Sequence, residues 1–235
     1  MKLLLISNSR TEGLGYLEHA LPEIRRFLGA SVKKVLFLPF AGVTIEWDEY
    51  TRRVAEALEL LGLECTGAHT EADAFAAIRA AQAIAVGGGN TWQLTREIHR
   101  RMLAGPIREA VRGGTPYFGW SAGANVACPT MQTTNDMPIC DPLGFDALGL
   151  VPFQINPHYL HGNPPGFKGE TREERIFEYG KLHPKVWVAG LREGSILRIE
   201  DAAIRLVGGA ALRAFHHGEP PREVEPGADC SFLLS

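Results

Sequence analysis

The chain has 235 residues, 45% of them hydrophobic and 22% charged, which is typical of a globular protein and favours one large α/β domain. A formal net charge of −3, without any run of Lys or Arg, argues against nucleic acid or an anionic membrane as a partner. The four cysteines are widely spaced and form no CxxC pair, so we expect free thiols in a reducing cytoplasm: Cys65, Cys128, Cys140 and Cys230.

The first residues predict a buried strand rather than an export signal. Met1 to Ser7 contains only four consecutive aliphatic residues, Leu3 to Ile6, whereas a signal peptide needs an apolar stretch of about 7–15 residues. No other segment approaches the ~18 apolar residues of a membrane-spanning helix. We therefore expect a cytoplasmic protein.

Short apolar runs alternate with helical patterns over the first two-thirds of the chain. The predicted strands are Lys2–Ser7, Lys33–Phe40, Ala83–Val86 and Pro116–Trp120. The predicted helices are Leu14–Leu28, Trp47–Leu61, Thr91–Arg101 and Ala122–Cys128. Continuous apolar strands that alternate with helices indicate a mostly parallel, doubly wound sheet with helices on both faces.

The pattern changes after about Cys128. The segment Pro129–His161 is rich in Pro, Asn, Asp and Gly, with one strand predicted at Phe153–Asn156, and Thr171–Lys181 is a charged helix. Four further strands are predicted in meander order at Trp187–Leu191, Ser195–Ile199, Ala203–Val207 and Leu212–Phe215. Because no linker or repeat interrupts the chain, we expect a single domain over residues 1–235.

One strand-to-helix turn carries a nucleophile signature. Gly119-Trp120-Ser121-Ala122-Gly123 matches G-x-S-x-G, in which a sharp turn lifts a serine hydroxyl out of the backbone. The helix that follows points free N–H groups at the same place, which favours a developing oxyanion. The pattern alone also fits a glycine-rich turn with an inert serine, and its place between a strand and a helix makes catalysis an equally good interpretation.

A glycine-rich loop follows the strand that ends at Val86. Gly87-Gly88-Gly89-Asn90 lacks both the G-x-G-x-x-G spacing and the Gly-Lys-Ser/Thr of nucleotide-binding loops. We therefore expect no nucleotide there. The loop can instead supply one backbone N–H of an oxyanion hole, with the N–H of Ala122 as the second donor.

A serine nucleophile needs a base, and the base needs an acceptor that orients it. Among eight histidines, His158 follows the predicted strand Phe153–Asn156, and His161 is its main competitor. Glu193 follows the strand Trp187–Leu191. The other acids that could reach the site are Asp136, Asp141 and Asp146. The order Ser, His, Glu disfavours an α/β-hydrolase, in which the acid precedes the histidine.

Several segments together resemble the α-aspartyl dipeptidase (peptidase E) family of serine peptidases, which has the fold of class I glutamine amidotransferase domains. The resembling segments are Phe37–Val43, Trp47–Tyr50, Val86–Thr91, Gly119–Asn125, Thr133–Pro138, Gln154–His158 and Lys168–Glu173. They run in order as far as about Glu193, and the likeness fades beyond Ser195.

The resemblance implies a role for each matching residue. Ser121 would be the nucleophile, His158 the general base and Glu193 the acidic member of the triad. It further implies that the N–H groups of Gly88 or Gly89 and of Ala122 hold the oxyanion. Arg172 would bind the aspartyl carboxylate of the substrate, a role that suits the planar fork of a guanidinium.

The same resemblance leaves Asp136 with two possible roles, binding the free amino group of the substrate or bracing the site. The expected substrates are dipeptides with a free N-terminal aspartate, and no metal or organic cofactor is required. The chain is expected to act as a monomer or a homodimer. The alternatives are a related peptidase for an acidic polymer of the cyanophycin type and a non-catalytic binding protein on the same fold.

Overall fold

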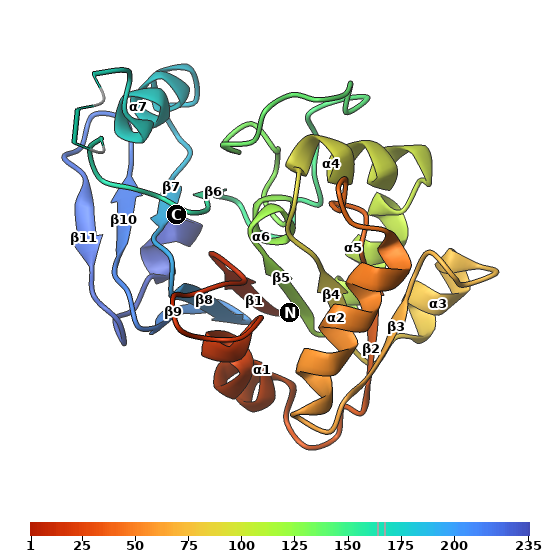
Figure 1. Ribbon diagram of the computed structural model, residues 1–235. Helices are drawn as coiled ribbons and strands as arrows, with labels where there is room; N and C mark the ends of the chain where they lie inside the picture. Colours follow the sequence, from red (N-terminus) through yellow and green to blue (C-terminus); the bar gives the residue numbers. More distant parts are fainter. Residues whose placement is uncertain (164, 167) are drawn as a thin grey trace.

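Two β-sheets organise the protein, and the larger one lies at its centre (Figure 1). The structure is a computed structural model that describes residues 1–163, 165–166 and 168–235. The larger sheet has seven strands in the order β3-β2-β4-β5-β1-β8-β9. These are β1 (Lys2–Ile6), β2 (Lys34–Leu38), β3 (Glu64–Gly67), β4 (Ile84–Val86), β5 (Tyr117–Trp120), β8 (Ser195–Glu200) and β9 (Ala203–Gly208).

The first five strands of this sheet are parallel, and β8 and β9 extend it in antiparallel fashion beyond β1. The smaller sheet has the order β11-β10-β7-β6 and lies beside the larger one (Figure 1). Its strands are β6 (Gln154–Asn156), β7 (Val188–Leu191), β10 (Leu212–Phe215) and β11 (Arg222–Val224). Strands β6 and β7 are parallel, so their carboxyl ends meet at one edge.

Helices cover the larger sheet on both faces. They are α1 (Leu21–Leu28), α2 (Trp47–Glu59), α3 (Ala74–Ala80), α4 (Thr91–Arg100), α5 (Ala104–Arg112) and α6 (Ala122–Asn125), and short 3₁₀ turns occur at η1 (Glu18–Ala20) and η2 (Ser231–Leu234). Helix α7 (Arg172–Leu182) packs on the smaller sheet instead. Leu3 and Leu5 of β1 pack in one cluster with residues of α4 and α5, whereas Leu4 and Ile6 pack in another with residues of α1 and α2. Burial on both faces explains why the strand is apolar at every position.

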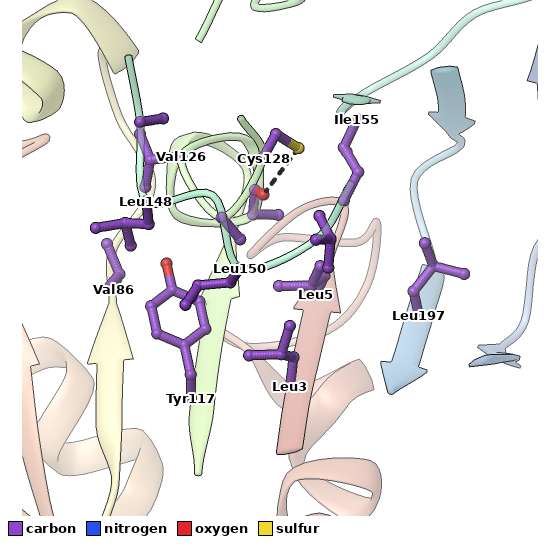
Figure 2. Packing of buried hydrophobic residues seen from close by; sticks show 14 of the residues in the cluster. Leu3, Leu5, Val86, Tyr117, Val126, Cys128, Leu148, Leu150, Ile155 and Leu197 are labelled. Carbon is purple, nitrogen blue, oxygen red and sulfur yellow. Dashed lines mark hydrogen bonds between the residues drawn. The ribbon is translucent and has the colours of Figure 1, made fainter. Parts of the chain in front are cut away.

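Apolar side chains below α6 fix the place of the turn that precedes this helix. Leu3, Leu5, Val86 and Tyr117 rise from three neighbouring strands toward this helix in Figure 2. The Tyr117 hydroxyl donates a hydrogen bond of 2.6 Å to the carbonyl of Gly123 inside the helix. Each fully buried Leu or Val contributes roughly 1.5–3 kcal/mol, so this cluster holds α6 firmly against the sheet.

The predicted fold class is confirmed, with helices on both faces of a mostly parallel sheet and additional C-terminal strands. The meander order is wrong. Among these C-terminal strands, β8–β9 and β10–β11 are the hairpin neighbours, because the chain crosses from the smaller sheet to the larger one between β7 and β8 and returns between β9 and β10. Gly194, with φ of 88°, lies at the first crossing and permits the sharp change of direction.

Several predicted boundaries also shift. Leu17 has a left-handed φ of 59°, so the first regular helix begins at Leu21 rather than Leu14. Helix α6 ends at Asn125 instead of Cys128. Strand β3 and helices α3 and α5 were not predicted at all. In the described part of the chain, no helix is both long enough and apolar enough to cross a membrane.

Candidate active site

Ser121 lies on a sharp turn between β5 and α6, at the carboxyl end of the central strands. Its backbone has φ of 52° and ψ of −113°, a combination that occurs at the first corner of a type II′ turn and favours glycine. The Ser121 N–H donates to the carbonyl of Ile6 at 3.0 Å, which ties the turn to β1. A serine in this conformation is strained, and the surrounding contacts hold it there.

The glycines on either side of this turn are required by close packing. A Cβ atom at Gly119 would lie 2.4 Å from the carbonyl oxygen of Gly123. One at Gly123 would lie 2.1 Å from the carbonyl oxygen of Val86. The glycines of the G-x-S-x-G pattern therefore let the turn pack directly against β4.

His158 lies beside Ser121, although 37 residues separate them in the sequence. It follows β6 directly, after Pro157, and its backbone also has a positive φ, of 53°. Its Nε2 atom lies 2.9 Å from the Ser121 Oγ, and its Nδ1 atom lies 2.7 Å from the Glu193 Oε1. With the proton on Nδ1, the ring donates to Glu193 and accepts from the Ser121 hydroxyl, which is the tautomer a general base requires.

Glu193 comes from the turn between β7 and β8. Its side chain is 57% exposed and that of His158 is 37% exposed, so the hydrogen-bonded row of three groups opens to solvent at the acid. The three residues thus come from three strand ends, β5, β6 and β7, in two different sheets. Of the competing residues, His161 contacts Glu173 instead, through its Nδ1 atom at 3.1 Å.

Two buried polar residues directly after β1 fix the backbone on either side of the histidine and the acid. The Ser7 hydroxyl accepts from the N–H of His158 at 3.0 Å and donates to the carbonyl of Leu191 at 2.8 Å. The Asn8 side chain accepts from the N–H of Gly194 at 2.8 Å. Ser7 and Asn8 are almost fully buried, at 0% and 1% exposure. Sequence reasoning missed both, because their partners are distant in the chain.

Three residues that share the cleft with Ser121 or follow it in the chain have backbone N–H groups without an acceptor in the described part of the chain. Within residues 1–163, 165–166 and 168–235, the N–H groups of Gly88, Gly89 and Ala122 donate to no acceptor. Gly88 packs closely on the turn, because a Cβ atom there would lie 3.0 Å from the Cβ of Ser121. Ala122 is the first residue of α6, where the helix leaves its N–H unpaired.

Asp136 binds the N-terminus of α4. Its Oδ2 atom accepts from the N–H of Thr91 at 2.7 Å and from the Thr91 hydroxyl at 2.6 Å. A carboxylate at a helix N-terminus is stabilised by the helix dipole. Asp136 also lines the cleft that contains Ser121. Neither Asp141 nor Asp146 lines that cleft; the backbone carbonyl of Asp146 accepts from the ring of His99.

Arg172 is the first residue of α7 and contacts the backbone of His158. Its guanidinium donates to the backbone carbonyls of His158 and Pro157. It lines a small pocket of about 170 Å³ rather than the cleft around Ser121, and Asp136 contributes to both. Burial and the nearby Arg175 lower the pKa of Arg172, while Glu193 and Asp136 act in the opposite direction.

The cleft around Ser121 has a volume of about 640 Å³. Besides the residues already described, it is lined by two arginines, Arg10 and Arg53, and by two tyrosines, Tyr16 and Tyr50. None of these four was assigned a role from the sequence. Tyr50 belongs to the resembling segment Trp47–Tyr50, which was the one available signal. A cleft with two guanidinium groups suits a substrate that carries carboxylates.

An ion-pair network supports the strands that carry the base and the acid. Arg192, next to Glu193, binds both carboxylate oxygens of Glu223 at 2.8 Å, and Arg213 binds the same carboxylate at 2.8 Å. These two arginines lower the pKa of Glu223 to about 2. The Arg192 guanidinium also lies 5.6 Å from the ring centre of Tyr159, the residue after His158.

Among the described residues, no group of three or more His, Cys, Asp or Glu side chains is arranged to hold a metal ion. The four cysteines are unpaired, and burial raises the pKa of Cys65 to about 12 and that of Cys230 to about 11. Such thiols stay protonated and are poor nucleophiles at neutral pH. In the part of the chain that the structure describes, no cysteine lines the cleft around Ser121, so the serine is the best-placed nucleophile in the site.

The strained serine is hydrogen-bonded to a histidine, the histidine is hydrogen-bonded to a carboxylate, and N–H groups without an acceptor among the described residues lie beside them. This arrangement is that of a serine hydrolase on an α/β fold. The sequence profile of peptidase family S51 matches residues 3–207. The chain belongs to peptidase family S51.

Relatives named peptidase E match almost the whole chain. The peptidase E of Nostoc sp. PCC 7120 is 47% identical over 233 residues, which cover 99% of this chain and 96% of that protein. The peptidase E of Citrobacter koseri is 50% identical over 227 residues, covering 97% and 99%. At this identity over full length, the chain is a serine peptidase of the same kind.

Solved structures share the fold. The crystal structure of a Listeria monocytogenes EGD-e protein, described as a candidate peptidase E, superposes with a TM-score of 0.66 at 26% identity, covering 89% of this chain and 98% of that one. A peptidase from an acI-B1 actinobacterium superposes with a TM-score of 0.68, covering 98% and 96%. At 19% identity, the second likeness concerns the fold alone.

Proposed function

We propose that this protein is an α-aspartyl dipeptidase that removes a free N-terminal aspartate through an acyl-enzyme on Ser121. The observation that carries the proposal is the hydrogen-bonded row Ser121–His158–Glu193, with distances of 2.9 and 2.7 Å, on a strained strand-to-helix turn. The name that the full-length relatives carry, peptidase E, supports the same activity.

In this mechanism the Ser121 Oγ attacks the carbonyl carbon of the N-terminal aspartate. His158 accepts the hydroxyl proton on Nε2 and then donates it to the leaving amine. Glu193 remains ionised and accepts from Nδ1–H, which fixes the ring tautomer and stabilises the imidazolium. Water then attacks the aspartyl-enzyme, with His158 again as the base. No metal or organic cofactor takes part.

The N–H of Ala122 and that of Gly88 or Gly89 are proposed to hold the oxyanion. All three lack an acceptor among the described residues, and α6 adds the positive end of its first turn. Loss of one such donor typically lowers the rate about 100–1000-fold. Asp136 is proposed to brace this region through Thr91, or to bind the amino group of the substrate.

Arg172 is proposed to bind the aspartyl side chain. Its guanidinium now contacts two backbone carbonyls, so substrate binding would exchange these for a carboxylate, which is the stronger partner. Arg10 and Arg53 line the cleft itself and offer alternative cations. The single substitutions Arg172→Gln, Arg10→Gln and Arg53→Gln separate the three. The arginine that binds aspartate is the one whose loss abolishes the preference for Asp-Leu over Ala-Leu.

The test of the activity uses purified wild type and Ser121→Ala with four substrates: Asp-Leu, Ala-Leu, Leu-Asp and N-acetyl-Asp-Leu. Free leucine is measured in each reaction. We expect the wild type to cleave Asp-Leu alone and the variant to cleave nothing. Equal cleavage of Ala-Leu would refute the aspartate specificity but keep the serine chemistry. No cleavage by folded wild type would refute the dipeptidase, and an acidic polymer would become the leading substrate.

The protein is further proposed to act in the cytoplasm as one domain, either a monomer or a homodimer. Four free cysteines suit a reducing compartment. One apolar cluster includes residues of both sheets, among them Leu197 of β8 and Leu212 of β10, which supports a single folding unit. Light scattering coupled to size-exclusion chromatography distinguishes the two oligomeric states.

A further inference from the structure

One buried hydroxyl, that of Tyr50, connects the glycine loop to the turn that carries Ser121. Tyr50 lies in the first turn of α2 and is only 5% exposed. Its hydroxyl donates to the carbonyl of Gly88 at 2.9 Å and accepts from the indole Nε1–H of Trp120 at 3.2 Å. Trp120 directly precedes Ser121, so a single side chain contacts both halves of the proposed catalytic machinery.

The bond to Gly88 fixes the direction of one peptide group. In a trans peptide the C=O and the following N–H point in opposite directions. Because the Gly88 carbonyl points to Tyr50, the N–H of Gly89 points away from it, and it has no acceptor among the described residues. The neighbouring N–H of Gly88 belongs to a different peptide group, which this bond does not hold.

The other side of the loop is held equally tightly. Gly89 has a φ of 135°, and a Cβ atom there would lie 2.3 Å from the carbonyl oxygen of Ala41. That same carbonyl accepts from the N–H of Asn90 at 2.9 Å. Tyr50 therefore holds the carbonyl of the Gly88–Gly89 peptide, and the Ala41 carbonyl holds the next peptide, Gly89–Asn90, and packs against the Cα atom between them. The two contacts leave little freedom for the Gly88–Gly89 peptide to rotate.

We propose that Tyr50 is a positioning residue that holds the Gly88–Gly89 peptide so that the N–H of Gly89, not that of Gly88, forms the oxyanion hole with Ala122. This inference rests on the proposed serine peptidase mechanism. A donor that is aimed before the reaction stabilises the oxyanion without reorganisation during it. Burial raises the pKa of Tyr50 well above its usual value, which keeps the hydroxyl protonated and able to donate.

Tyr16 provides a matched control from the same cluster. Its hydroxyl donates to the Tyr50 hydroxyl at 3.1 Å and accepts from the Trp120 Nε1–H at 3.0 Å, but it does not contact Gly88. Tyr16→Phe and Tyr50→Phe each delete one oxygen atom from one network. Only the second deletion releases the glycine loop.

The experiment measures kcat and KM for Asp-Leu and the affinity of a boronic acid analogue of aspartate, which forms a tetrahedral anionic adduct with a reactive serine. For Tyr50→Phe we expect kcat to fall about 10–100-fold, somewhat less than for complete loss of a donor, with KM changed less than about threefold. Boronate affinity should fall by the same factor as kcat. For Tyr16→Phe, which leaves the bond from Tyr50 to the Gly88 carbonyl in place, kcat and boronate affinity should fall by a clearly smaller factor than for Tyr50→Phe.

Equal effects of the two substitutions, or a loss in KM rather than kcat for Tyr50→Phe, would overturn the proposal. A measurement on the wild type covers the case in which Tyr50→Phe does not fold. In protein labelled with ¹⁵N-glycine, boronate binding should move the amide proton of Gly89 further downfield than that of Gly88. A larger shift at Gly88 would refute the assignment. This readout needs only a reactive Ser121, so it is independent of whether Asp-Leu is a substrate.

Discussion

Replacing Ser121 with glycine should give a more stable protein than replacing it with alanine, although both variants lack the nucleophile. The Ser121 backbone, with φ of 52° and ψ of −113°, is unfavourable for any residue with a Cβ atom. Alanine keeps the Cβ and the strain, whereas glycine removes both. The hydrogen bond to His158 is lost in either variant, so the comparison isolates the backbone conformation.

The expected difference follows from two opposing contributions. Relief of the strained conformation contributes about 1–3 kcal/mol. Glycine makes the unfolded chain more flexible, which costs about 0.5–1 kcal/mol. The net gain of Ser121→Gly over Ser121→Ala is about 1 kcal/mol, which corresponds to about 2–4 °C in melting temperature for a chain of this size.

Calorimetry and urea unfolding at pH 7 measure both variants against the wild type. The reasoning would be refuted if Ser121→Gly melted at or below the temperature of Ser121→Ala. That result would mean that the turn relaxes when the hydroxyl is removed, so that no strain remains for glycine to relieve. A crystal structure of Ser121→Ala would then have to show φ of residue 121 in a common region.

Substitutions at three further positions test other parts of the structure. Gly123→Ala should destabilise the protein by about 3 kcal/mol or more in urea unfolding, because the new Cβ would lie 2.1 Å from the Val86 carbonyl oxygen; a loss below about 1 kcal/mol would contradict the packing. Thr171→Ala removes the N-cap of α7 and should cost about 1 kcal/mol by calorimetry, whereas Thr171→Ser should restore most of it. Glu223, whose pKa falls from 4.5 in the unfolded chain to about 2 in the folded one, contributes stability above pH 4.5 and loses it as the pH falls to about 2. The difference in the free energy of unfolding between wild type and Glu223→Gln should be about 1 kcal/mol at neutral pH, because the ion pair is partly exposed, and should disappear over that interval in urea unfolding. A difference that stays constant with pH would refute the linkage.

The parallel part of the larger sheet could be predicted because each central strand is a continuous apolar run. The prediction Lys33–Phe40 contains β2, and Ala83–Val86 contains β4. Strand β3 was missed because it lies at the sheet edge, where only one of its four residues is buried. Helix α3 was missed because four of its seven residues are alanine, which leaves little apolar periodicity.

Strand pairing in the C-terminal third could not be predicted, because the partners are distant in sequence. Strand β8 pairs with β1, almost 200 residues earlier, and β7 pairs with β10. A strand has the same alternation of polar and apolar residues whichever strand it pairs with, so this pattern does not identify its partner. Two crossings between the sheets, one at Gly194 and one between β9 and β10, distinguish the observed arrangement from a meander. A glycine after a charged residue is an ordinary turn in a sequence, so the first crossing has no signal of its own.

The same distinction between local and long-range contacts applies to the residues of the site. The strand-to-helix turn at Ser121 was predictable because its signal, two glycines between a strand and a helix, is local. His158 and Glu193 could be selected among the other histidines and acids because they follow predicted strands and match the family that the sequence resembles. The residues that hold them, Ser7 and Asn8, act through contacts that span 151 and 186 residues. No local pattern marks such residues, and burial of small polar side chains becomes visible only in three dimensions.

The division of the proposed triad between two sheets bears on when a newly synthesised molecule becomes active. Ser121 stands on the sheet formed mainly by the first half of the chain, whereas His158 and Glu193 stand on strands completed by β10 and β11. During translation, the serine leaves the ribosome well before the strands that place its base. We therefore expect peptide hydrolysis to begin only after the last strands have joined, and a chain that ends before β10 to lack activity.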